Sequence, residues 1–541
     1  MKARGTGQAV GRARTVTADT PVGAGHGEAI APYPLGLYGV FAVPVCMTGG
    51  DTVIRTPALR RRLVVAAALA VAAVCLWAVA GGTTASQAVT RVPKAVVTPD
   101  WSSYLFAADH AGYNPSATSI TTAKAKSLVK VWHWTPGPAA AGQVGGLYAS
   151  PVVSGGLVFI GARTGVFYAL NEATGAVVWK RTFAPIVGTT CGPQGFTSTA
   201  TVAPDPSTGT ATVYVAAPDG YLYAMDAATG TIVWSSVVAI PSTTKNDYYN
   251  WASPTVSGGV IYMGISSECD TPLVRGGVIA VDQGTGNQLG TYYTTPAGEV
   301  GAGVWGSVLV SDAGQVFATT GNGPANSDQQ AIVRLVLDPV AGTLTRVDLW
   351  AIPKTQQVTP DSDFGTSPTP FVASVGGVPT AMVGGCNKDG YYYALQAADL
   401  AAGPLWSLKE GDPYLRGTGQ CDASAVWDGS HLFLSGNSTI VNGVAVKGSL
   451  REVDPSTGAV LWATGLPGPA IGSATLDGVG VLAIGVYGGK TGPFLIDAST
   501  GHLLKTLSVG NGKSFGQSIF TDSGLLLATT QSSGITAFKA S

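Results

Sequence analysis

One phrase recurs eight times after residue 150, and this repeat constrains the fold more than any other feature of the sequence. Its clearest copy is residues 224–234, Ala-Met-Asp-Ala-Ala-Thr-Gly-Thr-Ile-Val-Trp. Each copy follows a run of β-branched and aromatic residues with the length of a strand. Self-similarity at a period of tens of residues indicates one supersecondary unit stacked many times. The other copies are residues 169–179, 280–290, 337–350, 394–406, 452–462, 495–505 and a truncated last copy at 535–538.

Four-stranded sheets stacked radially into a ring account for this pattern, because strands and Gly-, Asn- and Asp-containing turns alternate throughout residues 97–541. In each phrase Thr-Gly is expected to form a tight turn, and the Trp four residues later is expected to pack between neighbouring blades. A strand at 128–134 lies outside the repeat. Pairing it with the last strand of the chain would close the ring and remove a free edge. We predict an all-β, eight-bladed propeller, with seven blades as the alternative count, and one short helix within residues 119–130.

The region before the propeller carries a targeting signal. Three arginines, 60–62, precede an apolar stretch at 63–80 that is followed by small residues. This order is typical of a signal peptide, and the stretch is also long enough for an uncleaved signal anchor. We therefore assign residues 47–96 to a signal peptide or anchor with a short linker, and residues 1–46 to an upstream extension without function. The expected location is extracellular or at the cell surface, with membrane contact only through residues 63–80.

Composition excludes several classes of function. Only 11% of residues are charged and the net charge is -1, which argues against a nucleic-acid partner. No Cys-x-x-Cys-His motif occurs, so we expect no covalently bound haem, and five scattered histidines argue against a histidine metal site. Two of the six cysteines precede the propeller. The other four, which allow up to two disulfides of undetermined connectivity, are Cys191, Cys269, Cys386 and Cys421.

The repeat resembles the blade phrase of the quinoprotein propellers, a family that contains dehydrogenases using pyrroloquinoline quinone (PQQ) with calcium, and also scaffolding members without a cofactor. Segments between the phrases resemble the dehydrogenase branch, in the same order along the chain. Those segments are 101–115, Glu268 with 273–282, 303–307 around Trp305, 320–324 around Asn322, 361–365 around Asp363, and 387–390 around Lys388. The Asp-Phe-Gly form at residues 363–365 also resembles the polyvinyl-alcohol dehydrogenase subgroup.

The resemblance implies a role for each of these residues. Glu268 and Asn322, with Asp361 beside them, would bind calcium, which prefers carboxylate and amide oxygens and acts as a Lewis acid. Asp363 would be the catalytic base that takes the alcohol proton. Three further residues would contact the quinone: Trp305 as an aromatic platform, Lys388 beside the quinone oxygens, and Arg275 in the Val-Arg-Gly segment.

The cysteines depart from the family pattern. Many of these dehydrogenases cover the quinone with a disulfide between adjacent cysteines, and this chain has no Cys-Cys pair. Cys191 occupies the corresponding loop, and a bond from Cys191 to Cys269 would place a different lid over the site. A bond between Cys386 and Cys421 would clamp the turn that carries Lys388. Ordinary stabilising disulfides or free thiols are the alternative.

Two functions fit the sequence. The first is an exported dehydrogenase, dependent on PQQ and calcium, that oxidises an alcohol, polyol or sugar hydroxyl and passes electrons to a separate acceptor such as a cytochrome. The second is a cofactor-free propeller that binds a protein or glycan. Each site residue also has an ordinary structural explanation as a turn, loop or core residue. We favour the dehydrogenase because Glu268, Asn322, Asp363, Lys388 and Trp305 occur together and in order.

Overall fold

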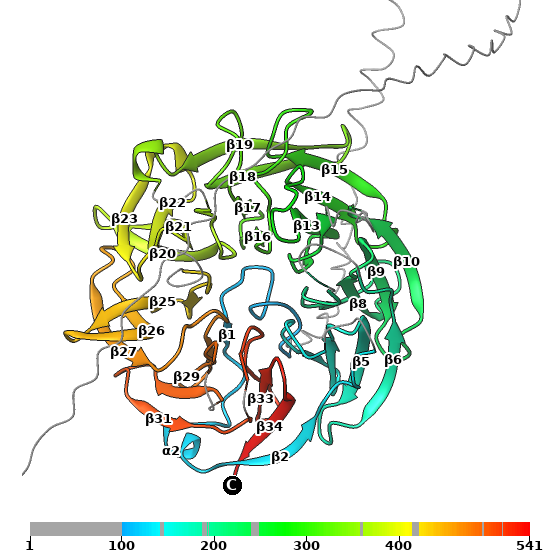
Figure 1. Cartoon of the computed structure of the whole chain (residues 1–541), viewed down its shortest axis with the longest axis vertical. Helices are drawn as coiled ribbons and strands as arrows, with labels where there is room; N and C mark the ends of the chain where they lie inside the picture. The colour runs from blue at the N-terminus through cyan, green and yellow to red at the C-terminus, as the bar shows by residue number, and fades with distance from the viewer. Residues whose placement is uncertain are drawn as a thin grey trace, which may run out of the picture. The chain divides into compact units, whose positions relative to one another are not determined.

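Eight antiparallel sheets surround a common axis in the computed structural model (Figure 1). The structure describes residues 100–140, 145–186, 192, 194–239, 248–357, 361–413, 421–488, 492–510 and 512–541. The predicted all-β, eight-bladed propeller is therefore confirmed. Among the described residues, no helix has both the length and the apolar character needed to span a membrane. The targeting segment predicted at 47–96 and the extension at 1–46 lie outside the described residues.

The first four blades follow the chain in order, each from its innermost to its outermost strand. Blade one is β3 (Val152–Ser154), β4 (Leu157–Gly161), β5 (Val166–Asn171) and β6 (Val177–Thr182). Blade two is β7 (Thr201–Pro204), β8 (Ala211–Ala216), β9 (Tyr221–Asp226) and β10 (Ile232–Val237). Blade three is β12 (Thr255–Ser257), β13 (Val260–Ser267), β14 (Gly277–Asp282) and β15 (Gln288–Tyr293), with β11 (Tyr248–Tyr249) added beside β13. Blade four is β16 (Leu309–Val310), β17 (Val316–Thr319), β18 (Ala331–Asp338) and β19 (Thr343–Ala351).

The next three blades continue this order. Blade five is β20 (Thr369–Val375), β21 (Val378–Cys386), β22 (Tyr391–Gln396) and β23 (Pro404–Lys409), and short 3-10 helices lie at η1 (Lys354–Gln356) and η2 (Leu400–Ala402). Blade six is β24 (Val426–Trp427), β25 (Leu432–Val441), β26 (Val444–Val453) and β27 (Val460–Leu466). Blade seven is β28 (Thr475–Asp477), β29 (Val481–Ile484), β30 (Phe494–Asp497) and β31 (Leu503–Thr506), with β1 (Tyr113–Asn114) beside β28.

Blade eight closes the ring with strands from both ends of the described chain. Its inner strands are β32 (Ile519–Phe520), β33 (Leu525–Thr530) and β34 (Gly534–Ala540), and its outermost strand is β2 (Leu128–Trp134). Strand β2 pairs antiparallel with β34, from Leu128 opposite Ala540 to Trp134 opposite Ile535. The predicted closure is confirmed, and the predicted short helix is α2 (Thr122–Ala125), just before β2.

The repeated phrase forms a contact between neighbouring blades, here called the lock, in which the Trp of one blade packs on the Thr-Gly turn of the next. In blade two, Asp226 Oδ1 accepts hydrogen bonds from the backbone N–H and the hydroxyl of Thr229, both 2.8 Å long, which fixes the turn. Gly230 follows with φ +69°, and a Cβ there would lie 2.6 Å from the ring of Trp179 in blade one. The Trp179 indole N–H donates to Ala227 O at 3.0 Å. Each Trp therefore covers the glycine of the next blade's turn, where a side chain has no room.

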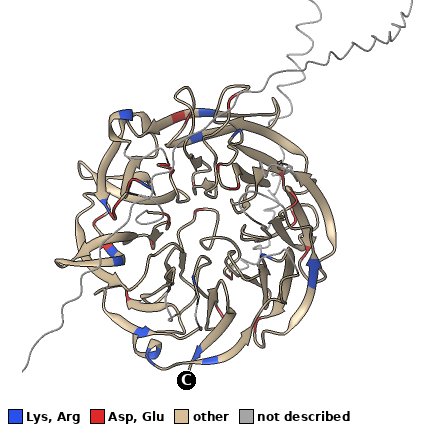
Figure 2. Ribbon diagram, viewed as in Figure 1, with Lys and Arg blue, Asp and Glu red and all other residues tan. Residues whose placement is uncertain are grey.

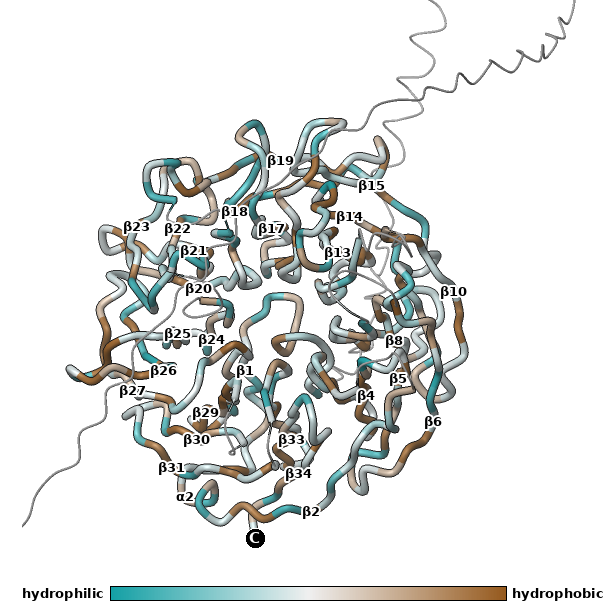
Figure 3. Tube along the Cα trace, viewed as in Figure 1, coloured by the Kyte–Doolittle hydropathy of each residue, from teal (hydrophilic) through white to brown (hydrophobic). Residues whose placement is uncertain are grey.

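Two blades replace the tryptophan of the lock. Blade three has Gly290 at that position, and the space is filled by Leu337 and Leu344 of blade four. Blade seven has Lys505, whose ammonium donates to Lys126 O and Leu128 O at 3.0 and 2.9 Å and so ties blade seven to blade eight. Within the described residues, eight hydrophobic clusters form, one at each interface between neighbouring blades. Apolar residues run through the strands of the whole ring (Figure 3), while Lys and Arg lie mostly near its perimeter (Figure 2).

Residues 101–115, which we call the central segment, cross the middle of the ring before the first blade begins (Figure 1). Backbone carbonyls of this segment accept hydrogen bonds from five different blades, at 2.7 to 3.0 Å. The donors are the N–H groups of Val153, Val202, Val310, Trp427 and Leu476. The segment thus holds the inner strands of blades one, two, four, six and seven at fixed positions around the axis.

Candidate functional site

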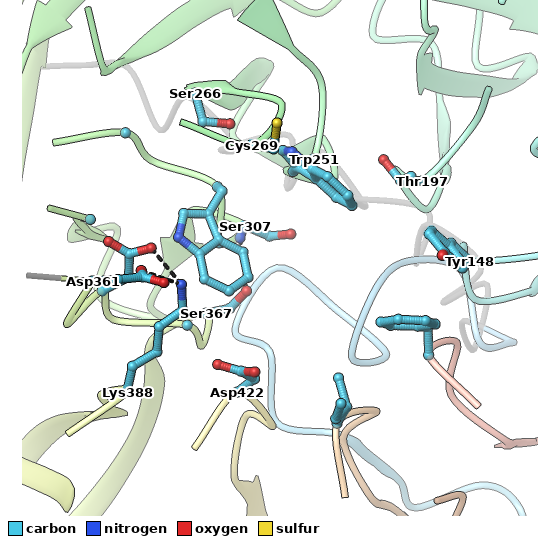
Figure 4. Close-up of a pocket in the computed structure, with 18 of the residues that line it drawn as sticks. Tyr148, Thr197, Trp251, Ser266, Cys269, Ser307, Asp361, Ser367, Lys388 and Asp422 are labelled. Carbon is cyan, nitrogen blue, oxygen red and sulfur yellow. Dashed lines mark hydrogen bonds and ion pairs between the residues drawn. The ribbon is translucent and has the colours of Figure 1, made fainter. Parts of the chain in front are cut away.

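A cavity of about 830 Å³ lies on the axis of the ring (Figure 4). Its lining includes residues from all eight blades or the connections that lead into them, from Tyr148 before blade one to Phe515 before blade eight. Tyr104 of the central segment also lines it. Figure 4 shows that Lys388, Asp361 and Asp422 lie on one side of the cavity and Tyr148 on the other. The charged groups are thus gathered on the side of blades four to six.

Lys388 is the cation at the centre of this charged side. It lies in the tight turn between β21 and β22, where Asn387 Oδ1 accepts the Asp389 N–H and Gly390 has φ +91°. Its ammonium donates to Asp361 Oδ1 at 2.7 Å and to Asp363 Oδ2 at 2.8 Å. Burial lowers the pKa of Lys388, but the nearby carboxylates outweigh it and raise that pKa above its ordinary value. Lys388 therefore stays protonated.

Asp363 is buried and is held by one further residue, Asn322 of blade four. The backbone N–H of Asn322 donates to Asp363 Oδ1. The Asn322 side-chain amide lies 2.9 Å from Asp363 Oδ1 and 3.1 Å from Asp270 Oδ2, and donates to both when its nitrogen faces them. When the amide is turned by half a rotation, three oxygens face one another instead. Carboxylate oxygens of Asp270, Asp361 and Asp363 lie within 4.8 Å of each other. This group of oxygens has the chemistry of a site for a hard cation.

Glu268 and Asp270 reach the cavity from the loop between β13 and β14 of blade three. Glu268 is buried, lines the cavity, and its backbone carbonyl accepts a 3.1 Å hydrogen bond from the Trp251 indole. Asp270 Oδ1 accepts from Ser267 Oγ at 2.7 Å, which leaves Oδ2 directed at Asn322. The Cys-Asp-Thr-Pro stretch at residues 269–272 thus brings a further carboxylate, that of Asp270, to the group. No role for Asp270 was predicted from the sequence.

Trp305 lines the cavity next to Lys388, whose ammonium lies 5.3 Å from the centroid of the indole ring. Gly365 allows this close arrangement, since a Cβ there would lie 3.1 Å from the Trp305 ring and 2.2 Å from Asp422 Oδ1. The glycine of the Asp-Phe-Gly segment is therefore needed for space. Trp305 thus forms an aromatic part of the cavity wall, and its contact with a quinone stays a prediction.

Arg275, one of the predicted cofactor-binding residues, has its partners outside the cavity. The Arg275 guanidinium donates to Thr295 O at 2.8 Å and stacks over Tyr293, 3.9 Å from its ring centroid, and Arg275 does not line the cavity. Cys191 lies outside the described residues. Cys269 is disulfide-bonded and lines the cavity, and the Cys191–Cys269 pairing stays a prediction.

The second predicted disulfide, Cys386–Cys421, is present. It joins the end of β21, two residues before Lys388, to the residue before Asp422. Asp422 lines the cavity, and burial raises its pKa to about 7. No motif singled out Asp422, and its position next to Cys421 was the one available signal.

Comparisons with known proteins agree with this architecture. A family model described as outer membrane protein assembly factor BamB matches residues 118–349. A quinohemoprotein alcohol dehydrogenase of Comamonas testosteroni is 26% identical over 360 residues, which cover 58% of this chain and 48% of that protein. The match thus spans about half the length of that relative.

Solved structures share the fold. The quinohemoprotein alcohol dehydrogenase from Comamonas testosteroni superposes with a TM-score of 0.60 at 18% identity, covering 82% of this chain and 81% of the other. One from Pseudomonas putida HK5 gives 0.61 at 16% identity, with 82% and 80% covered. A europium-containing methanol dehydrogenase gives 0.63 at 15% identity, with 81% and 90% covered.

Three independent observations now agree: the Asp-x-x-Thr-Gly-x-x-x-Trp phrase, the eight-bladed ring closed by β2 and β34, and the matches to quinoprotein propellers. In sequence and in fold, the chain is similar to quinohemoprotein alcohol dehydrogenases.

Proposed function

We propose that the protein is a PQQ- and calcium-dependent dehydrogenase that oxidises an alcohol or polyol hydroxyl and passes the electrons to a separate acceptor such as a cytochrome. The observation that carries this proposal is the convergence of Asn322, Asp361, Asp363, Lys388 and Trp305 in one axial cavity. These residues belong to blades four and five or to the connections that lead into them, and lie outside the repeated phrase. An exported location, based on the targeting signal, is part of the same proposal.

The residues present fit both cofactors. Calcium would be held by Asn322 Oδ1 and by the carboxylates of Asp270 and Asp361, with Glu268 of the same cavity as a further ligand. The donor set contains only oxygens, as a hard cation requires. The quinone would lie in the cavity against Trp305, where an aromatic wall suits a planar ring system. When bound, PQQ supplies a carbonyl carbon that accepts hydride, and calcium polarises that carbonyl.

The chain's own residues would accept the substrate proton and stabilise the negative charge that develops. Asp363 is the base nearest the cation site, and its carboxylate can take the proton of the substrate hydroxyl at Oδ1 or Oδ2. Lys388 holds Asp361 and Asp363 in position in the cofactor-free protein. Because the Lys388 ammonium stays charged, it is also placed to stabilise negative charge that develops in the cavity beside Trp305.

Calcium-dependent PQQ binding tests this proposal. We expect the purified protein to bind PQQ at micromolar concentration in the presence of calcium, seen by absorbance and by calorimetry, and to lose that binding with a chelator. Glu268→Gln combined with Asn322→Ala should abolish the calcium dependence. Gln288→Ala, in blade three on the exposed strand β15, is the matched control. Absence of PQQ binding, or binding that the double variant does not alter, contradicts the dehydrogenase.

A cofactor-free scaffold is the second candidate, and the family match described as an outer membrane assembly factor favours it. In a scaffold the axial groups have no ligand to bind. The same calorimetry separates the two candidates, because a scaffold should show no calcium-dependent binding of PQQ.

A further inference from the structure

A second, smaller cavity lies next to the axial cavity, between the central segment and the inner strands of blades two and three. Its volume is about 180 Å³. Thr199 lines the axial cavity, whereas Thr201, two residues further along the same segment, lines the smaller one. Tyr104 lines both, so the two cavities are direct neighbours. We call the smaller cavity the His110 pocket, after the histidine in its lining.

His110 carries an acceptor that has no partner. Its side chain is only 2% exposed, and burial lowers its pKa to about 3, so the ring is neutral. The Thr255 hydroxyl donates to Val308 O at 2.6 Å, and Thr255 Oγ1 therefore accepts from His110 Nε2–H at 3.4 Å. With the proton on Nε2, Nδ1 is an acceptor. In the described part of the chain, Nδ1 is the one buried side-chain atom of the pocket lining without a hydrogen-bond partner.

The fold holds His110 at this position. Ala108 O accepts the Val310 N–H at 3.0 Å and Ala111 O accepts the Trp427 N–H at 2.8 Å, so blades four and six fix the backbone on both sides of His110. His110 itself has φ +54°, a conformation that residues other than glycine rarely adopt. An unpaired buried acceptor is costly, and one that is fixed in a cavity indicates that a ligand supplies the donor.

The rest of the pocket lining is uncharged and largely apolar. Val202, Ala203, Pro254 and Val256 supply carbon atoms, and the Thr201 hydroxyl is already used because it donates to Pro254 O at 2.5 Å. None of the described residues that line the pocket is Asp, Glu, Lys or Arg. A buried ion without a countercharge is expensive, so the lining favours a neutral ligand. An apolar cavity of about 150 Å³ can hold a benzene molecule, so the His110 pocket has room for about six heavy atoms.

We propose that the His110 pocket is a second binding site, which takes a short neutral alcohol whose hydroxyl donates to His110 Nδ1 and whose carbon chain packs on the apolar lining. The hydroxyl supplies the one missing donor, and the carbon chain suits a lining that offers few polar partners. Water needs two to four polar partners and gains nothing from the apolar residues. The site goes beyond the proposed function, because it requires neither calcium nor a quinone.

Nitrogen-15 NMR of the full-length, histidine-labelled protein without added cofactor tests the proposal. A hydrogen bond donated to an unprotonated ring nitrogen moves the resonance of that nitrogen, and the His110→Gln spectrum identifies the His110 signals among those of the five histidines. We expect butan-1-ol to shift the His110 Nδ1 resonance in a saturable manner. Butan-2-one has the same number of heavy atoms but no donor, and should bind at least about tenfold more weakly. Butan-1-amine is an ammonium ion at neutral pH and should not bind.

Filling the pocket provides a test that leaves His110 in place. Ala203→Leu puts a larger side chain into the lining and should abolish the shift of His110 Nδ1 with butan-1-ol. Ala211→Leu is the matched control, because Ala211 is exposed on the neighbouring strand β8 of the same blade. This control should keep the full shift.

Two substitutions of His110 separate the roles of its two nitrogens. The amide oxygen of His110→Asn replaces Nδ1 as an acceptor, whereas the amide nitrogen of His110→Gln replaces Nε2 as the donor to Thr255. Fluorine-19 NMR with 4,4,4-trifluorobutan-1-ol measures the binding that Ala203→Leu removes. That binding should weaken by about tenfold or more in His110→Gln and by less than about threefold in His110→Asn.

Three results would overturn the proposal: no response of His110 Nδ1 to butan-1-ol, a response that persists in Ala203→Leu, or equal binding of butan-1-ol and butan-2-one. A hydrogen-bonded Nδ1 in the alcohol-free protein that no alcohol alters would show that the pocket holds water only, and would overturn it as well. Because no cofactor or turnover is involved, this result and the test of the dehydrogenase are independent.

Discussion

The rim and the axis of this propeller use polar groups in opposite ways. At the rim, the turn of each phrase satisfies its own polar groups, as Asp226 does with Thr229, and the tryptophan of the preceding blade covers the turn, as Trp179 does. At the axis, carboxylates and amides from different blades face one another and some have no partner in the described residues. The rim repeats and the axis does not. Repetition with satisfied polar groups indicates a structural role, whereas convergence of unsatisfied groups indicates a ligand.

Removing a rim tryptophan should have the largest effect. Trp179→Ala deletes the ring that covers Gly230 and the hydrogen bond to Ala227 O, and should lower the free energy of unfolding by about 3–5 kcal/mol. Urea denaturation followed by circular dichroism would measure this. The exposed neighbour Val178→Ala should cost less than about 1 kcal/mol. Calcium affinity of the folded Trp179→Ala protein should match the wild type, and a large change in affinity would show that rim and axis are coupled.

Removing an axial amide should weaken calcium binding and leave stability nearly unchanged. Asn322→Ala should weaken binding at the proposed calcium site by about 100-fold or more, since even outer partners of a metal site typically cost about 10- to 100-fold. Stability without calcium should change by less than about 1 kcal/mol, because Asp363 keeps Lys388 and the backbone N–H of residue 322 as donors. Calcium titration calorimetry and denaturation measure the two quantities. A stability loss as large as that of Trp179→Ala would make Asn322 a structural residue.

Replacing the axial lysine, Lys388, should change both calcium affinity and stability. Lys388→Met removes the positive charge between Asp361 and Asp363, so these carboxylates repel each other in the cofactor-free protein. Calcium can then replace the missing charge, and we expect calcium affinity to rise by about tenfold. Stability should fall without calcium and recover when calcium is added. Unchanged calcium affinity in Lys388→Met would place the cation site away from this pair.

The sequence predicted the rim more completely than the axis for a physical reason. The turn and the tryptophan of one phrase are local in sequence, and their contacts repeat, so a single copy such as residues 224–234 reveals all of them. Asn322, Asp363 and Lys388 were found because the segments around them resemble those of relatives. Asp270 and Asp422 had no such signal. Their meeting depends on how separate blades are stacked, which no local pattern contains.

The central segment shows the same limit. Residues 101–115 resemble the entry segment of quinoprotein dehydrogenases. Nothing in their sequence indicated that their backbone carbonyls would accept hydrogen bonds from five blades. Those bonds depend on the closed ring. The identity of a segment can be read from its residues, whereas its partners across the axis follow from the assembled fold.

Asp477 offers the smallest and sharpest test, because it is an unsatisfied carboxylate away from the cavity. It lies in β28 of blade seven and is 1% exposed, its Oδ1 accepts the Val479 and Val481 N–H groups, and its Oδ2 has no partner in the described residues. Burial raises the pKa of Asp477 to about 7, from an unfolded value near 3.8. Because the folded protein holds a proton that the unfolded chain has lost, the stabilising contribution present below pH 4 disappears as the pH rises to about 7.

Asp477→Asn should remove this dependence of stability on pH. The amide keeps an oxygen for the two backbone N–H groups, and without a buried charge the variant should be about 1–3 kcal/mol more stable than the wild type at pH 8, with little difference at pH 4. Denaturation at both pH values measures this, with the exposed Asp497→Asn turn variant of the same blade as a control expected to show no stabilisation at pH 8. If Asp477→Asn instead destabilises the protein at pH 8, the charged Asp477 carboxylate has a stabilising partner. Oδ2 of Asp477 would then bind a ligand, although it lies outside the cavity.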